Sequence, residues 1–325
     1  MAAIAVTALA PLANAETTLK VVSCLARNHD QTVTYFDHFH DPVHKAANGI
    51  TLRYLGGPEV TPESKQAAAV QRGLIDMTIC PSSYYAGMVP EARLTAIANQ
   101  GHRELRANGA YDMLQEAWAK GANMRIVAWP YWQGTEFHVY LTRQPKISEK
   151  TGVDLSGLKI RSTPLYNAFI TAMDGTPVGI APGEVYTSLQ RGVVNGLAWP
   201  EGAITKYGWQ EYIKYRIEPG FWRSSSMLTM NLDKYKAMPK KERDLLDAAG
   251  LKLEDESGPA QRKIVDIDNK KVFAAGVQVM KLEGEAAKNY LATINNAAWD
   301  DAKGRKLNVS YDKLRSLLYK ADGGS

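Results

Sequence analysis

The chain has 325 residues, of which 45% are hydrophobic and 22% charged, and its formal net charge is +5 at pH 7. This composition is that of a globular rather than a disordered protein, and the length allows two domains with sizeable cores. The basic residues form no block of the kind that binds nucleic acid, and the small positive balance is only weak support for acidic small molecules as ligands.

The first fifteen residues are predicted to be a signal peptide that does not belong to the fold. They form an uncharged apolar run ending in Ala13-Asn14-Ala15, a small-x-small cleavage site, before Glu16. The missing basic n-region points to a truncated or internal start, and a buried N-terminal helix is the alternative. Nothing later is long and apolar enough to span a bilayer. We therefore expect a soluble mature protein that is exported to the periplasm.

Strand-like and helical patterns alternate along the rest of the chain, which predicts an α/β fold with sheets covered by helices. The predicted strands are residues 18–24, 50–57, 74–80, 124–129, 137–142, 155–161, 175–180 and 224–232. The predicted helices are residues 32–48, 63–72, 103–120, 165–173, 181–192 and 239–271. Gly121 is expected to end the third helix. Pro259 is expected to kink or break the last one, because proline lacks the helical N–H. The number of strands indicates two α/β units.

The two cysteines, Cys24 and Cys80, each end a predicted strand. Their sulfurs share one edge if these strands are neighbours in a parallel sheet. An exported protein can form a disulfide, but the bond needs a specific geometry. Two separate buried thiols are the interpretation that we favour from the sequence, and a disulfide is the alternative.

Three histidines, His38, His40 and His44, lie within the first predicted helix. His40 and His44 are four residues apart and could share a helical face as a zinc pair. Pro42 argues against an uninterrupted helix here, so a solvated helix without a metal is the favoured interpretation.

A long motif surrounds Arg161. The segment "LSGLKIR" ends at this arginine, a Gly-x-Pro turn follows at 175–177, and an acidic-x-Tyr-x-x-Leu-Gln helix runs from Glu184 to Gly192. With "GGPEV", "QRGLIDM" and the late "AAGVQVMKL", this pattern resembles the solute-binding proteins of tripartite ATP-independent periplasmic (TRAP) transporters over nearly the whole mature chain. The resemblance implies a two-lobed periplasmic-binding-protein-like fold, with crossing strands and a long kinked helix joining the lobes.

The resemblance also implies a ligand held in the cleft between the lobes. Lobe I would comprise residues 16–133 plus 223–258, and lobe II residues 134–222 plus 259–325. Arg161 would grip the ligand carboxylate, which a planar guanidinium can bind through two hydrogen bonds. A structural salt bridge is the alternative role for this arginine. The protein would be a monomer without a cofactor or catalytic residue, and its partner would be a two-component TRAP membrane permease.

Two departures from the family pattern bear on the ligand. Ala198 and Trp199 stand where most members have an asparagine that helps to hold the ligand, and Glu136 and His138 lie where many have a second arginine. Dicarboxylates and sialic acids, which need two cationic anchors, are therefore not expected. Further aromatic side chains at positions expected near the cleft are Tyr84, Tyr85, Trp129, Tyr131 and Trp132. They would offer flat walls to a ring, with the lobe core as the alternative place for each.

The sequence thus predicts a receptor for an organic monocarboxylate, with an aromatic acid favoured. The loop after the first strand adds Arg27, Asn28 and His29 as contact candidates, and the third strand adds Ser82 and Ser83. The candidate ligand-binding residues are Arg161, Trp199, His138, Tyr85, Ser83, Asn28, Trp132 and Glu136. A small aliphatic 2-oxo or hydroxy acid, or a sugar acid, is the alternative ligand. A periplasmic hydrolase using Ser83 and His138 is a remote alternative, since the chain has neither a G-x-S-x-G nor an H-E-x-x-H motif.

Overall fold

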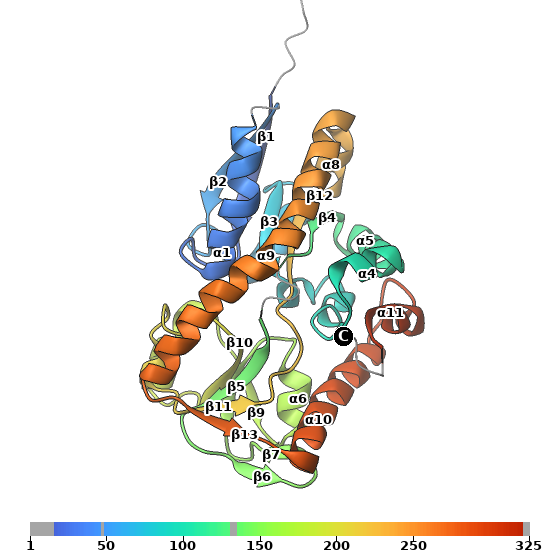
Figure 1. Cartoon of the computed structure of the whole chain (residues 1–325). Helices are drawn as coiled ribbons and strands as arrows, with labels where there is room; N and C mark the ends of the chain where they lie inside the picture. Colours follow the sequence, from blue (N-terminus) through green and yellow to red (C-terminus); the bar gives the residue numbers. More distant parts are fainter. Residues whose placement is uncertain (1–15, 47–48, 131–134, 321–325) are drawn as a thin grey trace, which may run out of the picture.

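The computed structural model describes residues 16–46, 49–130 and 135–320. It has two main β-sheets, one at each end of an elongated molecule, and a long helix that runs beside both (Figure 1). This confirms the mixed α/β fold with helix-covered sheets. Among the described residues, no helix combines the length and apolar character needed to cross a membrane.

The first sheet has the strand order β2-β1-β3-β12-β4. Strands β1, β2 and β3 are parallel, as the predicted β-α-β-α-β pattern requires, whereas β12 is antiparallel to both of its neighbours. The strands are β1 (Thr17–Ser23), β2 (Ile50–Gly56), β3 (Met77–Pro81), β4 (Met124–Ala128) and β12 (Ser226–Asn231). The helical elements of this part are α1 (Asp30–Tyr35), η1 (Phe36–His40), α2 (Asp41–Lys45), α3 (Glu63–Gln71), η2 (Ser82–Tyr85), η3 (Pro90–Arg93), α4 (His102–Ala107), α5 (Ala110–Ala122) and α8 (Leu232–Ala237).

The second sheet has the strand order β13-β11-β5-β10-β8-β9. Its strands are β5 (Phe137–Leu141), β8 (Lys159–Ser162), β9 (Thr176–Gly179), β10 (Gly196–Pro200), β11 (Tyr215–Glu218) and β13 (Gln278–Lys281), and β6 (Lys146–Ser148) pairs separately with β7 (Gly152–Asp154). Its helical elements are α6 (Asn167–Ala172), η4 (Pro182–Glu184), α7 (Val185–Gln190), η5 (Trp209–Glu211) and α10 (Gly284–Lys303), and α11 (Tyr311–Leu318) returns to pack against α5. The long helix is α9 (Lys240–Ala274).

The chain crosses between the sheets in two strand connections, from β4 to β5 and from β11 to β12. Phe137 and Phe221 hold these crossings side by side, since each backbone N–H donates to the other's carbonyl at 2.9 Å. Apolar cores lie on both sides of the crossings. Leu19, Leu246 and Leu253 belong to a cluster between the first sheet and α9, while a separate cluster under the second sheet includes Trp199 and Trp209.

Cys24 and Cys80 form a disulfide, with their Cα atoms 4.9 Å apart. Strands β1 and β3 are parallel neighbours, and Ser23 pairs with Ile79 in their register. The two cysteines therefore follow at the same edge of the sheet. Our preference for two separate thiols was wrong, because hydropathy alone does not show which strands are neighbours.

The helix predicted over 103–120 is two helices, α4 and α5. They separate at Gly109, whose φ of 89° belongs to the left-handed region that glycine adopts without strain. Gly121 does not end α5, because the helix continues to Ala122 and Asn123 takes the left-handed position after it. Gly121 is instead required by close packing, since a Cβ there would lie 2.7 Å from the Met88 carbonyl oxygen.

Neither Pro259 nor Pro42 breaks its helix, so of the kink or break predicted at Pro259 the break does not occur. Helix α9 continues through Pro259, held from both sides: the Trp129 N–H donates to Glu254 at 2.6 Å, and the Ile204 N–H donates to Asp268 at 2.9 Å. Tertiary contacts of this kind compensate for a lost helical hydrogen bond. At Pro42 the π-helical turn η1 leads directly into α2, because the Asp41 N–H donates to Phe36, five residues back.

Candidate ligand-binding site

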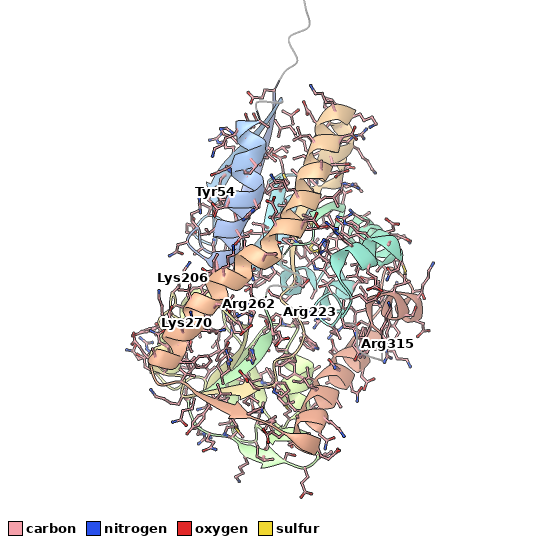
Figure 2. The ribbon with its side chains drawn as sticks, in the orientation of Figure 1. Tyr54, Lys206, Arg223, Arg262, Lys270 and Arg315 are labelled. Carbon is pink, nitrogen blue, oxygen red and sulfur yellow. A yellow bond between two sulfur atoms is a disulfide. The ribbon has the colours of Figure 1, made fainter. Side chains whose placement is uncertain are left out.

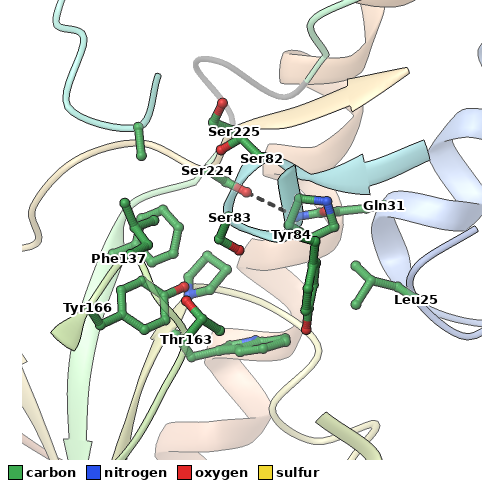
Figure 3. A pocket seen from close by; sticks show the side chains of 15 residues that line it. Leu25, Gln31, Ser82, Ser83, Tyr84, Phe137, Thr163, Tyr166, Ser224 and Ser225 are labelled. Atoms are coloured by element: carbon green, nitrogen blue, oxygen red, sulfur yellow. Dashed lines mark hydrogen bonds between the residues drawn. The ribbon is translucent and has the colours of Figure 1, made fainter. Parts of the chain in front are cut away.

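A narrow cavity lies between the two sheets, where the ends of β3, β8 and β10 meet the segment before β12 (Figure 3). Its lining residues are Leu25, Gln31, Pro81, Ser82, Ser83, Tyr84, Ala96, Phe137, Thr163, Leu165, Tyr166, Trp199, Pro200, Ser224 and Ser225. Ser83, Tyr84 and Thr163 also line a wider groove beside it, whose volume of about 560 Å³ is within the usual range for small-molecule sites.

Arg161 is completely buried beside this cavity, at the end of β8. Its Nε donates to the Ile180 carbonyl at 2.9 Å, but its two terminal amino groups have no hydrogen-bond acceptor in the described part of the chain. No carboxylate of the described residues forms an ion pair with it. A buried cation without a counter-charge is strongly unfavourable, so this arrangement suits an anion that is supplied from outside the chain.

Three phenols, of Tyr84, Tyr166 and Tyr207, lie near enough to Arg161 for its charge to affect their pKa values. Burial raises the pKa of Tyr84 to about 12, and the nearby Arg161 charge works in the opposite direction. Burial likewise raises the pKa of Tyr166 and Tyr207, again against the effect of Arg161. All three phenols are therefore neutral at physiological pH, and a neutral phenol can donate a hydrogen bond to an anion. The site offers one positive charge together with uncharged donors.

Trp199 contributes an aromatic wall on the same side. Its ring centre lies 5.0 Å from the Arg161 guanidinium carbon and 5.0 Å from the Trp209 ring, which meets it edge to face. The indole Nε1 donates to the Gly202 carbonyl at 3.2 Å, which fixes the ring plane. Figure 3 shows Tyr84 opposite Phe137 and Tyr166 across the cavity. These rings enclose a slot in which a flat ligand would contact aromatic faces.

The structure brings three of the eight predicted site residues together. Trp199 and Ser83 line the cavity, and Arg161 lies directly beside Trp199. Of the additional candidates, Ser82 and Tyr84 also line the cavity, whereas His29 is buried behind Trp199, with their ring centres 6.3 Å apart.

Four other predicted residues lie away from this cavity. Tyr85 is in the core beside the first sheet, where its hydroxyl is 2.9 Å from that of Thr229 in β12. Asn28 is exposed, and Glu136 lines a different pocket beside Gly220. His138 is held elsewhere, since its Nδ1 is hydrogen-bonded to the Ile217 carbonyl at 3.0 Å. Its burial, and to a smaller extent the positive charge of Arg216, lower its pKa.

Two further candidates, Trp129 and Arg27, do not line the cavity. Trp132 and Tyr131 fall outside the described residues. Trp129 is buried and donates to Ser225 at 2.8 Å, and the Arg27 guanidinium lies over the Phe36 ring.

The hydrolase alternative needs Ser83 and His138 in contact. His138 instead bonds the Ile217 carbonyl, and its Nε2 lies 4.0 Å from Glu201. Ser83 and His138 share no hydrogen bond within the described ranges. For the zinc alternative, the described residues contain no group of three metal-binding side chains. His38 lies 2.9 Å from Glu256, and His40 lies 2.9 Å from Asp41.

Several lining residues were missed from the sequence. Thr163 follows Arg161 by two positions, and the period of a strand would have placed both on one face. Tyr166, Phe137, Gln31 and Ser224 come from four separate segments. Nothing in their local patterns distinguishes them from ordinary core or loop residues, because only the tertiary fold brings them together.

Comparison with known proteins places the chain in a family. The model of the bacterial extracellular solute-binding proteins of family 7 (DctP) matches residues 23–305. A solved structure of DctP7, an extracytoplasmic solute receptor of Bordetella pertussis binding pyroglutamic acid, is 17% identical, with a TM-score of 0.80 over 94% of this chain and 100% of that one.

Two further solved structures have the same fold. A TRAP periplasmic solute-binding protein of Desulfovibrio salexigens with bound orotic acid is 15% identical, with a TM-score of 0.79 over 93% of this chain and 99% of that one. Another, from Roseobacter denitrificans with bound L-galactonate, is 20% identical, with a TM-score of 0.76 over 94% and 99%. Since the family model covers most of the chain, this protein belongs to the DctP family of TRAP solute-binding proteins.

Proposed function

We propose that the protein is the receptor that binds an organic monocarboxylate outside the cytoplasm and delivers it to a two-component TRAP membrane permease. The observation that carries this proposal is the complete burial of Arg161 with two amino groups lacking an acceptor among the described residues. A carboxylate meets both groups at once through paired hydrogen bonds. Apart from Arg161 beside it, no lysine or arginine of the described residues lies at this cavity, which favours one negative charge on the ligand.

The favoured ligand is an aromatic acid or another compact ring acid. Tyr84, Phe137, Tyr166 and Trp199 present ring faces or edges along the cavity, and stacking or edge contacts with a ligand ring would stabilise it there. Two of the structural relatives bind pyroglutamate and orotate, which are ring monocarboxylates, whereas a third binds the acyclic L-galactonate. A sugar acid would place hydroxyl groups without hydrogen-bond partners against the aromatic walls. Each such buried hydroxyl would cost about 1–3 kcal/mol of binding free energy.

The remaining parts of the proposal follow from family membership. The mature protein would begin at Glu16 in the periplasm, act as a monomer, and leave its ligand chemically unchanged. Lobe I would comprise residues 16–133 plus 223–258, and lobe II residues 134–222 plus 259–325. The two lobes would close on the ligand, with Arg161, Trp199 and Ser83 as contacts.

A thermal-shift screen of organic acids tests the proposal. Ligand that binds the folded state raises the unfolding temperature in a concentration-dependent way. We expect ring monocarboxylates to stabilise the protein and to be recovered intact, as judged by mass spectrometry. Stabilisation by dicarboxylates or uronic acids alone would contradict the proposed ligand class, and chemical conversion of the ligand would contradict the receptor function.

A further inference from the structure

Ser224 marks a second polar end of the cavity. It lies in the segment that crosses back to β12, is only 3% exposed, and lines the cavity together with Ser83 and Tyr84. Its backbone N–H donates to the Thr135 carbonyl at 3.0 Å, which fixes the position of the residue. Figure 3 shows its side chain beside Ser83, at the end of the cavity away from Thr163.

A buried hydrogen-bond relay orients the Ser224 hydroxyl. The Ser226 hydroxyl donates to Gln31 Oε1 at 2.8 Å, and Gln31 Nε2 donates to Ser224 Oγ at 2.9 Å. All three side chains are at least 95% buried, with exposed fractions of 1%, 5% and 3% for Ser226, Gln31 and Ser224. Because Ser224 Oγ accepts from Gln31, its own proton is the group left to donate. That proton has no acceptor within residues 16–46, 49–130 and 135–320.

A donor held in this way has chemical consequences for the ligand. Each bond in a relay polarises the next, so the last donor is strengthened. A buried donor that stays unpaired is costly, so a ligand without an acceptor at this position is penalised. The site therefore has a cation at Arg161 beside the cavity, aromatic walls along the cavity, and a neutral donor at Ser224.

We propose that Ser224 donates a hydrogen bond to an acceptor atom on the ligand's ring, and that the ligand is a ring monocarboxylate carrying such an acceptor. The acceptor would be a ring carbonyl, a ring nitrogen or a hydroxyl oxygen. Ser224 is then the specificity-determining residue, and Ser226 and Gln31 are positioning residues that act through it. This inference rests on the proposed function, because it assumes that the carboxylate is held at Arg161.

The effect of the ring acceptor on affinity is measured with sets of acids that have nearly the same shape and differ only in that acceptor. Benzoate is compared with picolinate, nicotinate and isonicotinate, in which one ring CH is replaced by nitrogen at each position in turn. Cyclopentanecarboxylate is compared with pyroglutamate, which adds a lactam carbonyl. Calorimetric titration of the whole mature chain should show at least one acceptor-bearing probe binding about tenfold more tightly than its carbocyclic match.

Variants test whether this preference belongs to Ser224. In Ser224→Ala the preference should fall below about threefold, while the affinity for the carbocyclic match stays within about twofold of wild type. Ser226→Ala should weaken the preference in part, and Ser226→Thr, which keeps the hydroxyl, should restore it. Ser188→Ala is the matched control, because it removes a serine hydroxyl that lies outside the cavity and donates to the Glu184 carbonyl at 2.8 Å. It should leave the preference unchanged. Should Ser224→Ala not fold, Ser224→Cys supplies a weak donor of similar size.

Three results would overturn the inference. They are equal affinities within both sets of probes, an unchanged preference in Ser224→Ala, or an equal loss of the preference in Ser188→Ala. Failure of the proposed function is a different result: no carboxylate probe binds, or binding persists at full strength in Arg161→Met. The two failures are therefore distinguishable in one series of titrations.

Discussion

The Arg161 guanidinium carbon lies 5.0 Å from the centre of the Trp199 ring, and the two residues come from neighbouring parallel strands. Arg161 pairs with Leu197 in the register of β8 and β10, so Trp199 is two residues farther along on the same face. Charge and aromatic surface thus form one wall at the carboxyl ends of these strands. A ligand held by its carboxylate at Arg161 would bring its adjacent ring against Trp199.

Replacing Trp199 should change which acids bind. In Trp199→Leu, planar ring acids such as benzoate should lose about three- to tenfold in affinity, because a ring pair contributes about 0.5–1.5 kcal/mol beyond its buried area. Small aliphatic acids such as pyruvate should be affected less. Trp199→Phe, which keeps a ring, is the matched control. An equal loss for both kinds of acid, measured by calorimetry, would contradict a stacking role.

Lys206 and Asp30 form an ion pair between segments that belong to different lobes in our proposal. Lys206 also donates to the Asn28 carbonyl at 3.0 Å, and Figure 2 shows it where the two halves of the molecule meet. Lys206→Met should weaken ligand binding by about two- to fivefold, since the closed form loses an ion pair between a partly exposed lysine and a buried carboxylate. Added salt should weaken binding by the wild-type protein but have less effect on the variant.

The control for this closure contact is Lys240→Met, which removes an ion pair with Asp244 that lies within α9 alone. It should leave affinity and salt dependence unchanged. Small-angle scattering should show compaction of wild-type protein on adding ligand. If Lys206→Met binds as tightly as Lys240→Met at low salt, the ion pair does not contribute to closure.

His29 makes stability dependent on pH. Burial, assisted by the Lys206 charge, holds its pKa at about 3 in the folded protein, against 6.5 as its ordinary value. Between these pH values the unfolded chain binds a proton that the folded protein excludes. Stability is therefore fully present above pH 6.5 and falls as the pH drops, by about 1.4 kcal/mol per pH unit for this one group.

The variant His29→Asn tests this assignment. Asparagine keeps a side-chain acceptor for the Gln31 N–H, which His29 Nδ1 accepts at 3.1 Å, but it does not titrate. Denaturant unfolding should show that stability falls by about 2 kcal/mol less in the variant than in wild type between pH 6.5 and 5.0. An identical fall in both proteins would assign the pH dependence to other groups.

Much of the architecture was predictable because strands and helices are encoded locally. The order of elements and the assignment of Arg161 to a strand end followed from apolar runs, glycines and one long motif. Pairing between strands is not encoded locally, which is why the Cys24–Cys80 disulfide was misjudged. The course of α9 through Pro259 likewise depends on Glu254 and Asp268 contacts with distant segments.

The site was predictable only in part, because the sequence does not show in which direction each side chain points. Tyr84 and Tyr85 are adjacent, yet one lines the cavity and the other bonds Thr229 in the core. His138 pairs with Trp199 across β5 and β10, but its ring is held by the Ile217 carbonyl. Sequence gives the residue types near a cleft, whereas the direction of each side chain is set by its tertiary partners.

The most direct test of the account is calorimetric titration of Arg161→Met with the tightest-binding ring monocarboxylate from the screen. Leaving the carboxylate without its charged partner should cost about 2–5 kcal/mol, so the affinity should fall by roughly thirtyfold or more. Arg161→Lys, which keeps the positive charge but not the paired donors of the guanidinium, should have an affinity between those of Arg161→Met and the wild type. Without ligand, Arg161→Met should be as stable as wild type or more so, because an unpaired buried charge is removed. Binding within about threefold of wild type, or a marked loss of ligand-free stability, would show that Arg161 is structural and contradict its role as the carboxylate anchor.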